Sequence, residues 1–179
     1  QDRRVVVIGA GIVGASLAYH LADKGANITV VEAEDIASGV TGTSFAWINT
    51  QHGKPDPIAK LRAAAIEAYR RLESRLPDLN IRWTGALSFN ATATEALPDS
   101  GHQVSANLVD RSQILGLEPN LRNPPQSAVY AADEGALDAV AATHALIAGA
   151  QANGAKILTQ TRVLGFVTRG ATVTGVETA

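Results

Sequence analysis

The sequence predicts an α/β fold in which helices flank a parallel sheet. Two apolar runs rich in β-branched residues, "VVVI" at 5–8 and "ITVV" at 28–31, have the composition of buried strands. The segment between them has helical spacing, because Leu17 and Leu21 fall on one face. The order strand, helix, strand within 4–32 is that of a βαβ unit, whose two strands are parallel.

The composition is that of a folded protein with an ordinary surface. Of 179 residues, 46 % are hydrophobic and 18 % are charged, which is enough apolar material for a core. The net charge is −2 with both signs scattered, so neither nucleic acid nor an anionic membrane is an expected partner. No apolar run approaches the ~18 residues of a membrane-spanning helix.

Two residue types are absent from the sequence. Because there is no cysteine, disulfides, thiolate catalysis and thiolate metal ligands are excluded for this chain. There is also no methionine, and the first predicted strand begins by Val5. We therefore expect a trimmed or partial chain without a secretion signal, and a cytoplasmic location.

After the second strand the sequence predicts a long loop and then a helix. Small residues dominate "ASGVTGTSFAWIN" at 37–49, within a loop of about 25 residues that follows Glu32. Asp56–Pro57 is typical of a helix start, with the acid as N-cap and the proline at the first helical position. The helix should end before Pro77, and its apolar residues have three- and four-residue spacing: Ile58, Leu61, Ala65, Tyr69, Leu72 and Leu76.

The middle of the chain has weaker patterns. The runs "IRW" and "ALSFN" within 81–90 flank Thr84–Gly85 and predict a hairpin. The proline-containing stretch 91–126 predicts a loop with one short helix after Asp110, and "SAVYAAD" at 127–133 predicts a strand.

The last part of the chain predicts a helix and then strands. Asp138 is the expected N-cap of a long alanine-rich helix that closes at Asn153–Gly154. The segment "KILTQTRVLGFVTRGATVTGVET" at 156–178 predicts two or three strands with a turn at Arg169–Gly170.

Three glycines directly after the first strand form the pattern G-x-G-x-x-G. Gly9 allows the tight turn into the helix, Gly11 leaves room for a pyrophosphate near the backbone, and Gly14 lets the helix pack closely on the strand. Free N–H groups at the helix start would hold the phosphates. Glu32 closes the second strand, where it could accept hydrogen bonds from a ribose hydroxyl. The alternative is a glycine turn in a parallel sheet, with Glu32 as a solvated strand end.

The acid and the loop after it narrow the choice of dinucleotide. An acid at this position disfavours the 2′-phosphate of NADP, which leaves NAD or FAD. An NAD-binding fold would continue promptly into another helix and strand, whereas a long loop of small residues follows Glu32. Small residues let a planar ligand lie close to the backbone, so the loop favours a cofactor that extends beyond its pyrophosphate, as a flavin does.

Three stretches together resemble the N-terminal part of the FAD-dependent amine and amino-acid oxidoreductases, the group of D-amino-acid oxidase, glycine oxidase and sarcosine oxidase. They are "VVVIGAGIVGASLAYHLADKGANITVVEAE", "ASGVTGTSFAWIN" and "DEGALDAVAATHALIAGAQANGAKILTQTRVLGF". The resemblance implies a Rossmann-like FAD-binding domain with a parallel sheet and helices, incomplete in this chain, at 1–50 and 127–179. It also implies that 51–126, a helical and β-hairpin insertion, is part of a second, substrate domain.

Carried over residue by residue, the resemblance implies a set of contacts with FAD. The glycine turn and the first amides of the helix would hold the pyrophosphate, and the acid would hold the adenosine ribose: Gly9, Gly11, Ile12, Val13, Gly14 and Glu32. The loop under the ribityl chain and the flavin ring would comprise Val40, Thr41, Phe45, Ala46 and Trp47. The backbone of Val163 would pair with the adenine edge.

This chain departs from the family pattern in two places. The family often carries a basic residue directly after the acid, where Ala33 stands here on the adenosine side of the site. The segment "SFAWIN" at 44–49 is bulkier than the small-residue version common in the family, which changes the flavin side.

The remaining polar and aromatic residues of the loop each allow two interpretations. The hydroxyls of Ser38, Thr41, Thr43 and Ser44 could donate to phosphate or flavin oxygens, or could bond their own backbone in turns. Trp47 could form a wall on the substrate side of the flavin, or could pack in the core.

The histidines provide one candidate catalytic residue, and histidines and acids together indicate no metal site. His52 follows the loop and is the candidate catalytic residue, able to tune the flavin or accept a proton, although isolated loop histidines commonly do neither. His20 and His144 fall within predicted helices and are expected to be structural. No spacing of histidines or acids indicates a metal site.

The resemblance implies oxidation of a C–N bond in a small amine or amino acid. A hydride leaves the carbon next to nitrogen for flavin N5, and the resulting imine is hydrolysed. It also implies longer relatives, whose later half completes the FAD domain and grips the substrate, so we expect this segment to be inactive alone.

Two alternatives to this function stay open. One is a non-catalytic dinucleotide-binding module, or one subunit of a split oxidoreductase completed by another chain, which an exposed apolar sheet edge near 173–176 would support. The other is an NAD-dependent dehydrogenase, which the long loop after Glu32 disfavours.

Overall fold

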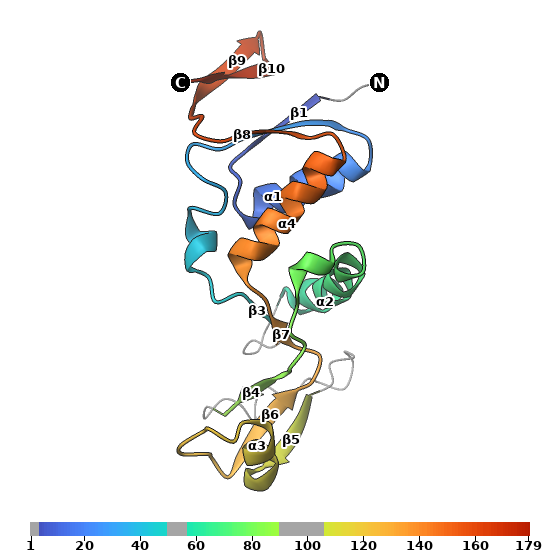
Figure 1. The fold of residues 1–179 in the computed structure, drawn as a ribbon, viewed down its shortest axis with the longest axis vertical. Helices are drawn as coiled ribbons and strands as arrows, with labels where there is room; N and C mark the ends of the chain where they lie inside the picture. Colours follow the sequence, from blue (N-terminus) through green and yellow to red (C-terminus); the bar gives the residue numbers. More distant parts are fainter. Residues whose placement is uncertain (1–3, 50–56, 90–105) are drawn as a thin grey trace. The chain divides into compact units, whose positions relative to one another are not determined.

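The computed structural model describes residues 4–49, 57–89 and 106–179, and it confirms the predicted α/β class (Figure 1). The chain forms two compact units. The first comprises Gln1–Ala46, Leu76–Asn80 and Asp138–Ala179, and the second comprises Trp47–Arg75 and Ile81–Leu137. The assignment of chain segments to a cofactor domain and a substrate domain stays a prediction.

The first unit is built on a parallel sheet of three strands. Their order is β1 (Arg4–Ile8), β2 (Asn27–Val31) and β8 (Lys156–Leu158). Helix α1 (Ile12–Asp23) connects β1 to β2, as the sequence predicts. Gly25 has φ +79° just after the helix, a backbone conformation that glycine adopts freely and that ends a helix.

Helix α4 (Ala139–Ala152) lies beside α1 in both views (Figure 1). Its start is the predicted one, because the Asp138 carboxylate accepts the N–H groups of Val140 and Ala141, each at 2.9 Å. Gly154, with φ +89°, follows its end as predicted.

The core of this unit lies between the two helices and one face of the sheet. Val7 of β1 and Ile28 and Val30 of β2 are buried there. Small residues let the helices approach closely, since a Cβ added to Gly149 of α4 would lie 2.8 Å from the ring of Tyr19 on α1. Tyr19 is therefore buried against a helix that has no side chain at the point of contact.

The opposite face of the same sheet is open along β1 and β8, whereas Val31 of the central strand β2 is 2 % exposed. Val6 and Ile8 of β1 and Leu158 of β8 are 41 %, 51 % and 45 % exposed. Among the described strands, β1 pairs with β2 alone, so its other edge presents backbone N–H and C=O groups without a strand partner. This face and edge are an apolar surface that the described part of the chain leaves uncovered.

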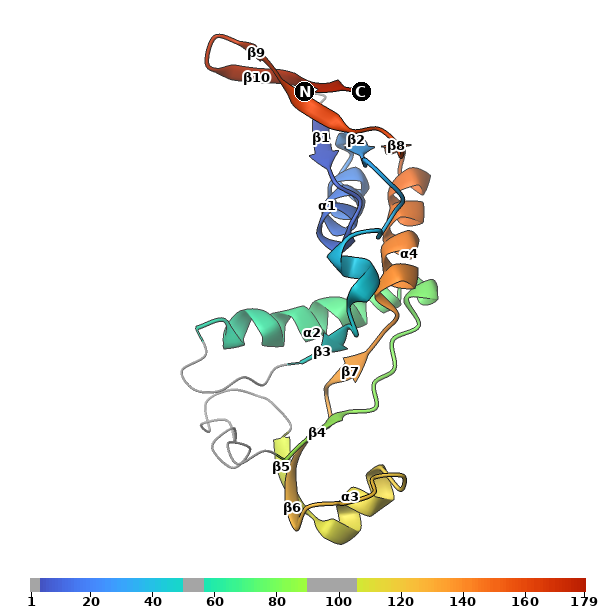
Figure 2. The same cartoon turned by 90° about the vertical axis from the view of Figure 1, so that its left-hand side faces the viewer.

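The chain ends in an antiparallel ribbon. Strands β9 (Val163–Arg169) and β10 (Thr172–Thr178) pair with each other and turn at Gly170, as predicted (Figure 2). Three strands, β8 to β10, thus occupy the segment for which the sequence predicts two or three.

The second unit contains an antiparallel sheet in the order β4 (Ala86–Ser88), β6 (Ser127–Ala131), β5 (Ala106–Asp110). The predicted strand at 127–133 and the predicted helix after Asp110 are confirmed, the latter as α3 (Arg111–Leu117). Strand β5 is a correction, because the sequence predicts a loop there.

The short helix α3 has both a cap and a core. The Asp110 carboxylate accepts the N–H of Gln113, and the Gln113 side chain accepts the N–H of Asp110, each at 2.9 Å. The contact between α3 and the sheet is a small cluster of buried residues: Val109, Ile114 and Ala128.

The predicted hairpin within 81–90 is wrong. Arg82 bridges to Ala136, and β4 pairs with β6, so both runs find their partners in the returning chain rather than in each other. Gly85 does have φ +74°, but a Cβ there would overlap the ring of Tyr130. The glycine therefore makes room for Tyr130 instead of reversing the chain.

Helix α2 (Ala59–Glu73) begins two residues later than predicted. Its N-cap is Ile58, whose φ of −108° is not helical, so Pro57 precedes the helix rather than opening it. The predicted cap Asp56 lies outside the described residues. The helix ends before Pro77, as expected, and Pro77 opens the short 3₁₀ helix η2 (Pro77–Leu79).

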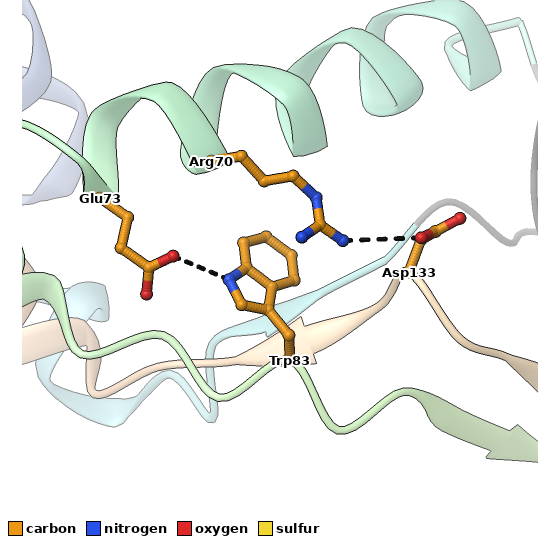
Figure 3. Close-up of polar contacts among 4 residues, drawn as sticks. All are labelled: Arg70, Glu73, Trp83 and Asp133. Carbon is orange, nitrogen blue, oxygen red and sulfur yellow. Dashed lines mark hydrogen bonds and ion pairs between the residues drawn. The ribbon is translucent and has the colours of Figure 1, made fainter.

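Four side chains connect the last turns of α2 to two other segments of the second unit (Figure 3). The Glu73 carboxylate accepts the N–H of Ile81 at 3.2 Å and the indole N–H of Trp83 at 2.9 Å. The Arg70 guanidinium lies over the Trp83 ring, 4.3 Å from its centroid, and pairs with Asp133 at 3.5 Å. Because the ion pair is exposed, the half-buried hydrogen bonds of Glu73 contribute more to the stability of the helix packing.

None of the helices in the described ranges combines the length and the apolar character needed to cross a bilayer.

Candidate dinucleotide-binding site

A cleft of about 950 Å³ in the first unit includes the turn from β1 into α1 and extends along both elements, where residues 5–8, Leu17 and Leu21 also line it. It brings together most of the residues predicted to bind a cofactor. From the glycine turn and α1 these are Gly9, Gly11, Ile12, Val13 and Gly14. From the end of β2 and the following loop they are Glu32, Ala33, Val40 and Thr41.

Four other residues predicted to bind the cofactor lie outside this cleft. Phe45, Ala46, Trp47 and Val163 do not line the cleft. His52 lies outside the described residues. The binding role of every predicted residue stays a prediction.

The turn between β1 and α1 requires glycine at two positions. Gly9 has φ +97°, and its N–H donates to the carbonyl of Val31 at 2.8 Å. A Cβ on Gly14 would overlap the carbonyl oxygen of Gly9 and lie 3.3 Å from a methyl group of Val7. The absence of a side chain at Gly14 is what allows α1 to start this close to β1.

Three backbone N–H groups at the start of α1 have no acceptor among the described residues: those of Gly11, Val13 and Gly14. The N-cap Gly11 has no side chain that could accept from them. Unpaired N–H groups at a helix N-terminus, together with the helix dipole, form a site for an anion. The arrangement is therefore suited to a phosphate group.

The N–H of Ile12 has a protein partner. It donates to Thr41 Oγ1 at 3.1 Å, and Thr41 is 8 % exposed. The same hydroxyl would lie 3.2 Å from a Cβ at Gly11. Because a hydroxyl can accept and donate at once, Thr41 keeps a proton that it can donate to a ligand.

The stretch after Glu32 is not one long loop as predicted. It contains the 3₁₀ helix η1 (Val40–Thr43) and strand β3 (Trp47–Ile48), because its backbone finds partners. The N–H of Ala37 donates to the carbonyl of Ala10 at 3.1 Å, which ties the loop to the glycine turn.

Two of the loop hydroxyls make turn contacts. Thr43 Oγ1 donates to the carbonyl of Val40 at 3.1 Å, and Ser44 Oγ accepts the N–H of Ala46 at 3.1 Å. These bonds are turn chemistry, but Ser44, like Ser38, also lines the cleft, so both alternatives for the loop hydroxyls stay open. Thr41 is the hydroxyl that contacts the glycine turn.

Glu32 is held by two backbone groups. Its Oε2 accepts the N–H of Ala10 at 2.7 Å, and its Oε1 accepts the N–H of Glu34 at 2.8 Å. Each carboxylate oxygen keeps a second lone pair, so both can also accept from a ligand hydroxyl. The carboxylate is therefore fixed at the end of β2 before any ligand binds.

Trp47 belongs to the second unit. There, β3 pairs with β7 (Gly135–Ala136), and the indole N–H of Trp47 donates to Glu134 Oε2 at 3.0 Å. Glu134 is 1 % exposed, whereas Trp47 is 36 % exposed. Sequence reasoning missed Glu134, since a single acid before a glycine carries no recognisable signal.

Sequence reasoning also missed Arg162, which lines the cleft. Its position directly before Val163 was the available signal, because Val163 is predicted to face the adenine edge.

The two histidines of the helices lie at the surface. The ring of His20 on α1 packs edge-on against Tyr19 with centroids 5.2 Å apart, and His144 is an exposed residue of α4. In the described ranges, no three histidine or acidic side chains gather closely enough to hold a metal ion.

Residues 4–179 match the protein-family model described as DAO, FAD dependent oxidoreductase. The chain belongs to this family. The predicted resemblance and the predicted cofactor, FAD, are thereby confirmed. The residues fit such a group, because unpaired amides suit its diphosphate and a fixed carboxylate suits its ribose.

Longer relatives of this chain differ in what they oxidise. The chain is 30 % identical to a component of the anaerobic glycerol-3-phosphate dehydrogenase of Escherichia coli, over 99 % of this chain and 34 % of that protein. It is 28 % identical to the glycine oxidase of Bacillus licheniformis, over 94 % of this chain and 48 % of that protein. The chain thus spans about a third to a half of the length of these relatives.

The fold is that of a solved family structure. The glycine oxidase of Bacillus cereus superposes with a TM-score of 0.86 at 22 % identity, over all of this chain and 53 % of that one.

Proposed function

We propose that the protein containing this chain oxidises a C–N bond of a small amine or amino acid. The observation that supports the cofactor part of this proposal is the cleft at the start of α1, where three amides have no acceptor in the described chain and a carboxylate is already fixed at the end of β2. The similarity to a glycine oxidase supports the choice of substrate class.

The residues of the chain bind and orient in this proposal. The amides of Gly11, Val13 and Gly14 hold the diphosphate, Thr41 donates its hydroxyl proton to it, and Glu32 accepts from the ribose. When bound, FAD supplies a hydride acceptor at N5 for the hydrogen on the carbon next to nitrogen, and water hydrolyses the C=N product. The residues that grip the substrate belong to the remaining part of the protein.

The open surface of the first unit supports a partner for this chain. The free edge of β1 is covered, in this proposal, by the C-terminal part of the protein or by a second, completing chain, and the exposed Val6 and Ile8 beside it also line the cleft. The ribbon adds a second such surface, since Val173 is 59 % exposed and β10 pairs only with β9 among the described strands. A non-catalytic module would use the same surfaces.

A second candidate function is oxidation of a C–O bond in a polyol phosphate. The similarity to a component of a glycerol-3-phosphate dehydrogenase supports it. The two candidates share the cofactor site and differ in the atom next to the carbon that loses hydride.

Purification of the full-length protein tests both. We expect a yellow protein whose released cofactor has the mass of FAD; a bound nicotinamide dinucleotide would refute the FAD site. Under exclusion of oxygen, bleaching of the flavin bands by glycine, sarcosine, proline or another amino acid supports C–N oxidation. Bleaching by glycerol 3-phosphate alone supports the second candidate, and flavin without bleaching by any of these substrates favours a non-catalytic module.

We also propose a cytoplasmic location, which cell fractionation with an antibody to the full-length protein tests.

A further inference from the structure

One end of the cleft carries a cation that the proposed function does not use. Arg162 lies in the connection between β8 and β9 and lines the cleft together with Glu32, Ala33 and Glu34. These are the residues at and after the end of β2, where the ribose of a dinucleotide is expected.

Hydrogen bonds fix the backbone on both sides of Arg162. The N–H of Thr161 donates to the carbonyl of Glu32 at 2.8 Å, and that of Gln160 donates to the carbonyl of Glu34 at 3.2 Å. On the other side, the carbonyl of Arg162 accepts the N–H of Ala179 at 2.9 Å. The position of Arg162 beside the end of β2 is therefore set by the fold and not by a flexible loop.

The side chain itself is available to a ligand. Among the described residues, no hydrogen bond or ion pair engages the guanidinium of Arg162, and the residue is exposed. Its guanidinium is planar and permanently charged, so it can stack on an aromatic ring or pair with a phosphate.

The neighbours of Arg162 decide between these two ligands. Glu32 and Glu34 place two carboxylates at this end of the cleft, and Glu32 is fixed by backbone N–H groups. A phosphate on the ribose would face these charges, whereas an uncharged adenine would not. The cleft lining contains no phenylalanine, tyrosine, tryptophan or histidine from the described residues, so the guanidinium is the planar group on which a purine can stack.

We propose that Arg162 stacks on the adenine ring of FAD and thereby contributes to the affinity and selectivity of the site for an adenine dinucleotide. This inference rests on the proposed FAD site. The small side chain of Ala33 leaves the neighbouring wall of the cleft open for the purine.

Ligand affinities of the full-length protein, stripped of its flavin, test the proposal. In Arg162→Ala we expect Kd to rise about 2- to 30-fold for both FAD and ADP, the range of a cation–π contact. The Kd for FMN, which has no adenine, should not change. For Arg162→Lys the Kd for FAD and ADP should lie between those of the unmodified protein and Arg162→Ala, because an ammonium group keeps the charge but lacks the planar surface.

Arg169→Ala is the matched control. It removes an equal charge from an exposed arginine at the end of β9 that does not line the cleft, and it should leave all three affinities unchanged. The thermal midpoint of each variant, expected to be unchanged, checks that the exposed substitutions leave the fold intact.

Three results would overturn the proposal while leaving the FAD site standing. They are an unchanged Kd for FAD and ADP in Arg162→Ala, an equal loss of FMN affinity, or tighter binding of 2′-phosphorylated ADP than ADP that depends on Arg162. If the unmodified protein binds no FAD at all, the proposed function fails and this inference fails with it.

Discussion

Replacing Glu32 with alanine should destabilise the protein even without any cofactor. Its carboxylate accepts the N–H of Ala10, a residue that is 0 % exposed, at 2.7 Å. In Glu32→Ala that donor loses its charged acceptor, which costs about 1–3 kcal/mol. The second donor, the N–H of Glu34, belongs to an exposed residue and can donate to water instead.

The same substitution should weaken cofactor binding. Loss of hydrogen bonds from a ribose to a charged acceptor costs about 1.5–3 kcal/mol, which corresponds to a Kd for FAD about 10- to 150-fold higher. For Glu32→Gln both the free energy of unfolding and the Kd for FAD should lie between those of the unmodified protein and Glu32→Ala, because its amide oxygen can still accept the N–H of Ala10.

Urea unfolding of the flavin-free protein and titration with FAD measure the two effects. The expected result is a lower unfolding midpoint with an unchanged slope, which indicates a change in stability rather than in the denatured state. Glu177→Ala is the control, because it removes the same charge from an exposed strand residue that does not line the cleft. If Glu32→Ala unfolds at the same urea concentration as the unmodified protein, the bond to Ala10 does not stabilise the turn.

Four further substitutions test other parts of the fold. Gly14→Ala should lower stability by about 1–3 kcal/mol and abolish FAD binding, because its Cβ would overlap the backbone of Gly9. Gly116→Ala in α3 meets no atom within 4 Å and should be neutral or stabilising by up to about 1 kcal/mol in thermal unfolding. Glu73→Ala leaves a buried N–H and an indole N–H without their acceptor, so urea unfolding should show a loss of about 2 kcal/mol; an unchanged midpoint would contradict this. Burial raises the pKa of the Tyr69 phenol above its ordinary value of 10.0. The folded state then keeps a proton that the unfolded chain loses, so stability is fully present below pH 10 and declines as the pH rises through the folded pKa. Tyr69→Phe should flatten that decline in unfolding free energy measured from pH 9 to 11.

Features that depend on neighbouring residues could be predicted from the sequence. The caps at Asp110 and Asp138, the left-handed glycines after α1 and α4, and the turn at Gly170 follow local rules of backbone conformation. The glycine turn before α1 and the acid at the end of β2 were also predicted, because the motif fixes both their spacing and their place in a βαβ unit.

Features that depend on residues distant in the sequence could not be predicted. The "IRW" and "ALSFN" runs pair with chain about fifty residues away, and no local pattern distinguishes that pairing from a hairpin. The same holds for strand β5, whose partner β6 lies beyond α3, and for Arg162, which reaches the cleft through the pairing of β8 with β2. The bond between Trp47 and Glu134 spans 87 positions in the sequence.

The first unit is assembled from three separate stretches of chain, with Leu76–Asn80 contributed from the middle of the sequence. No single cut in the gene can therefore release either unit whole, and truncation from either end first removes residues of the first unit, to which both chain ends belong. Obtaining the first unit by itself would require new peptide links that bypass 47–75 and 81–137.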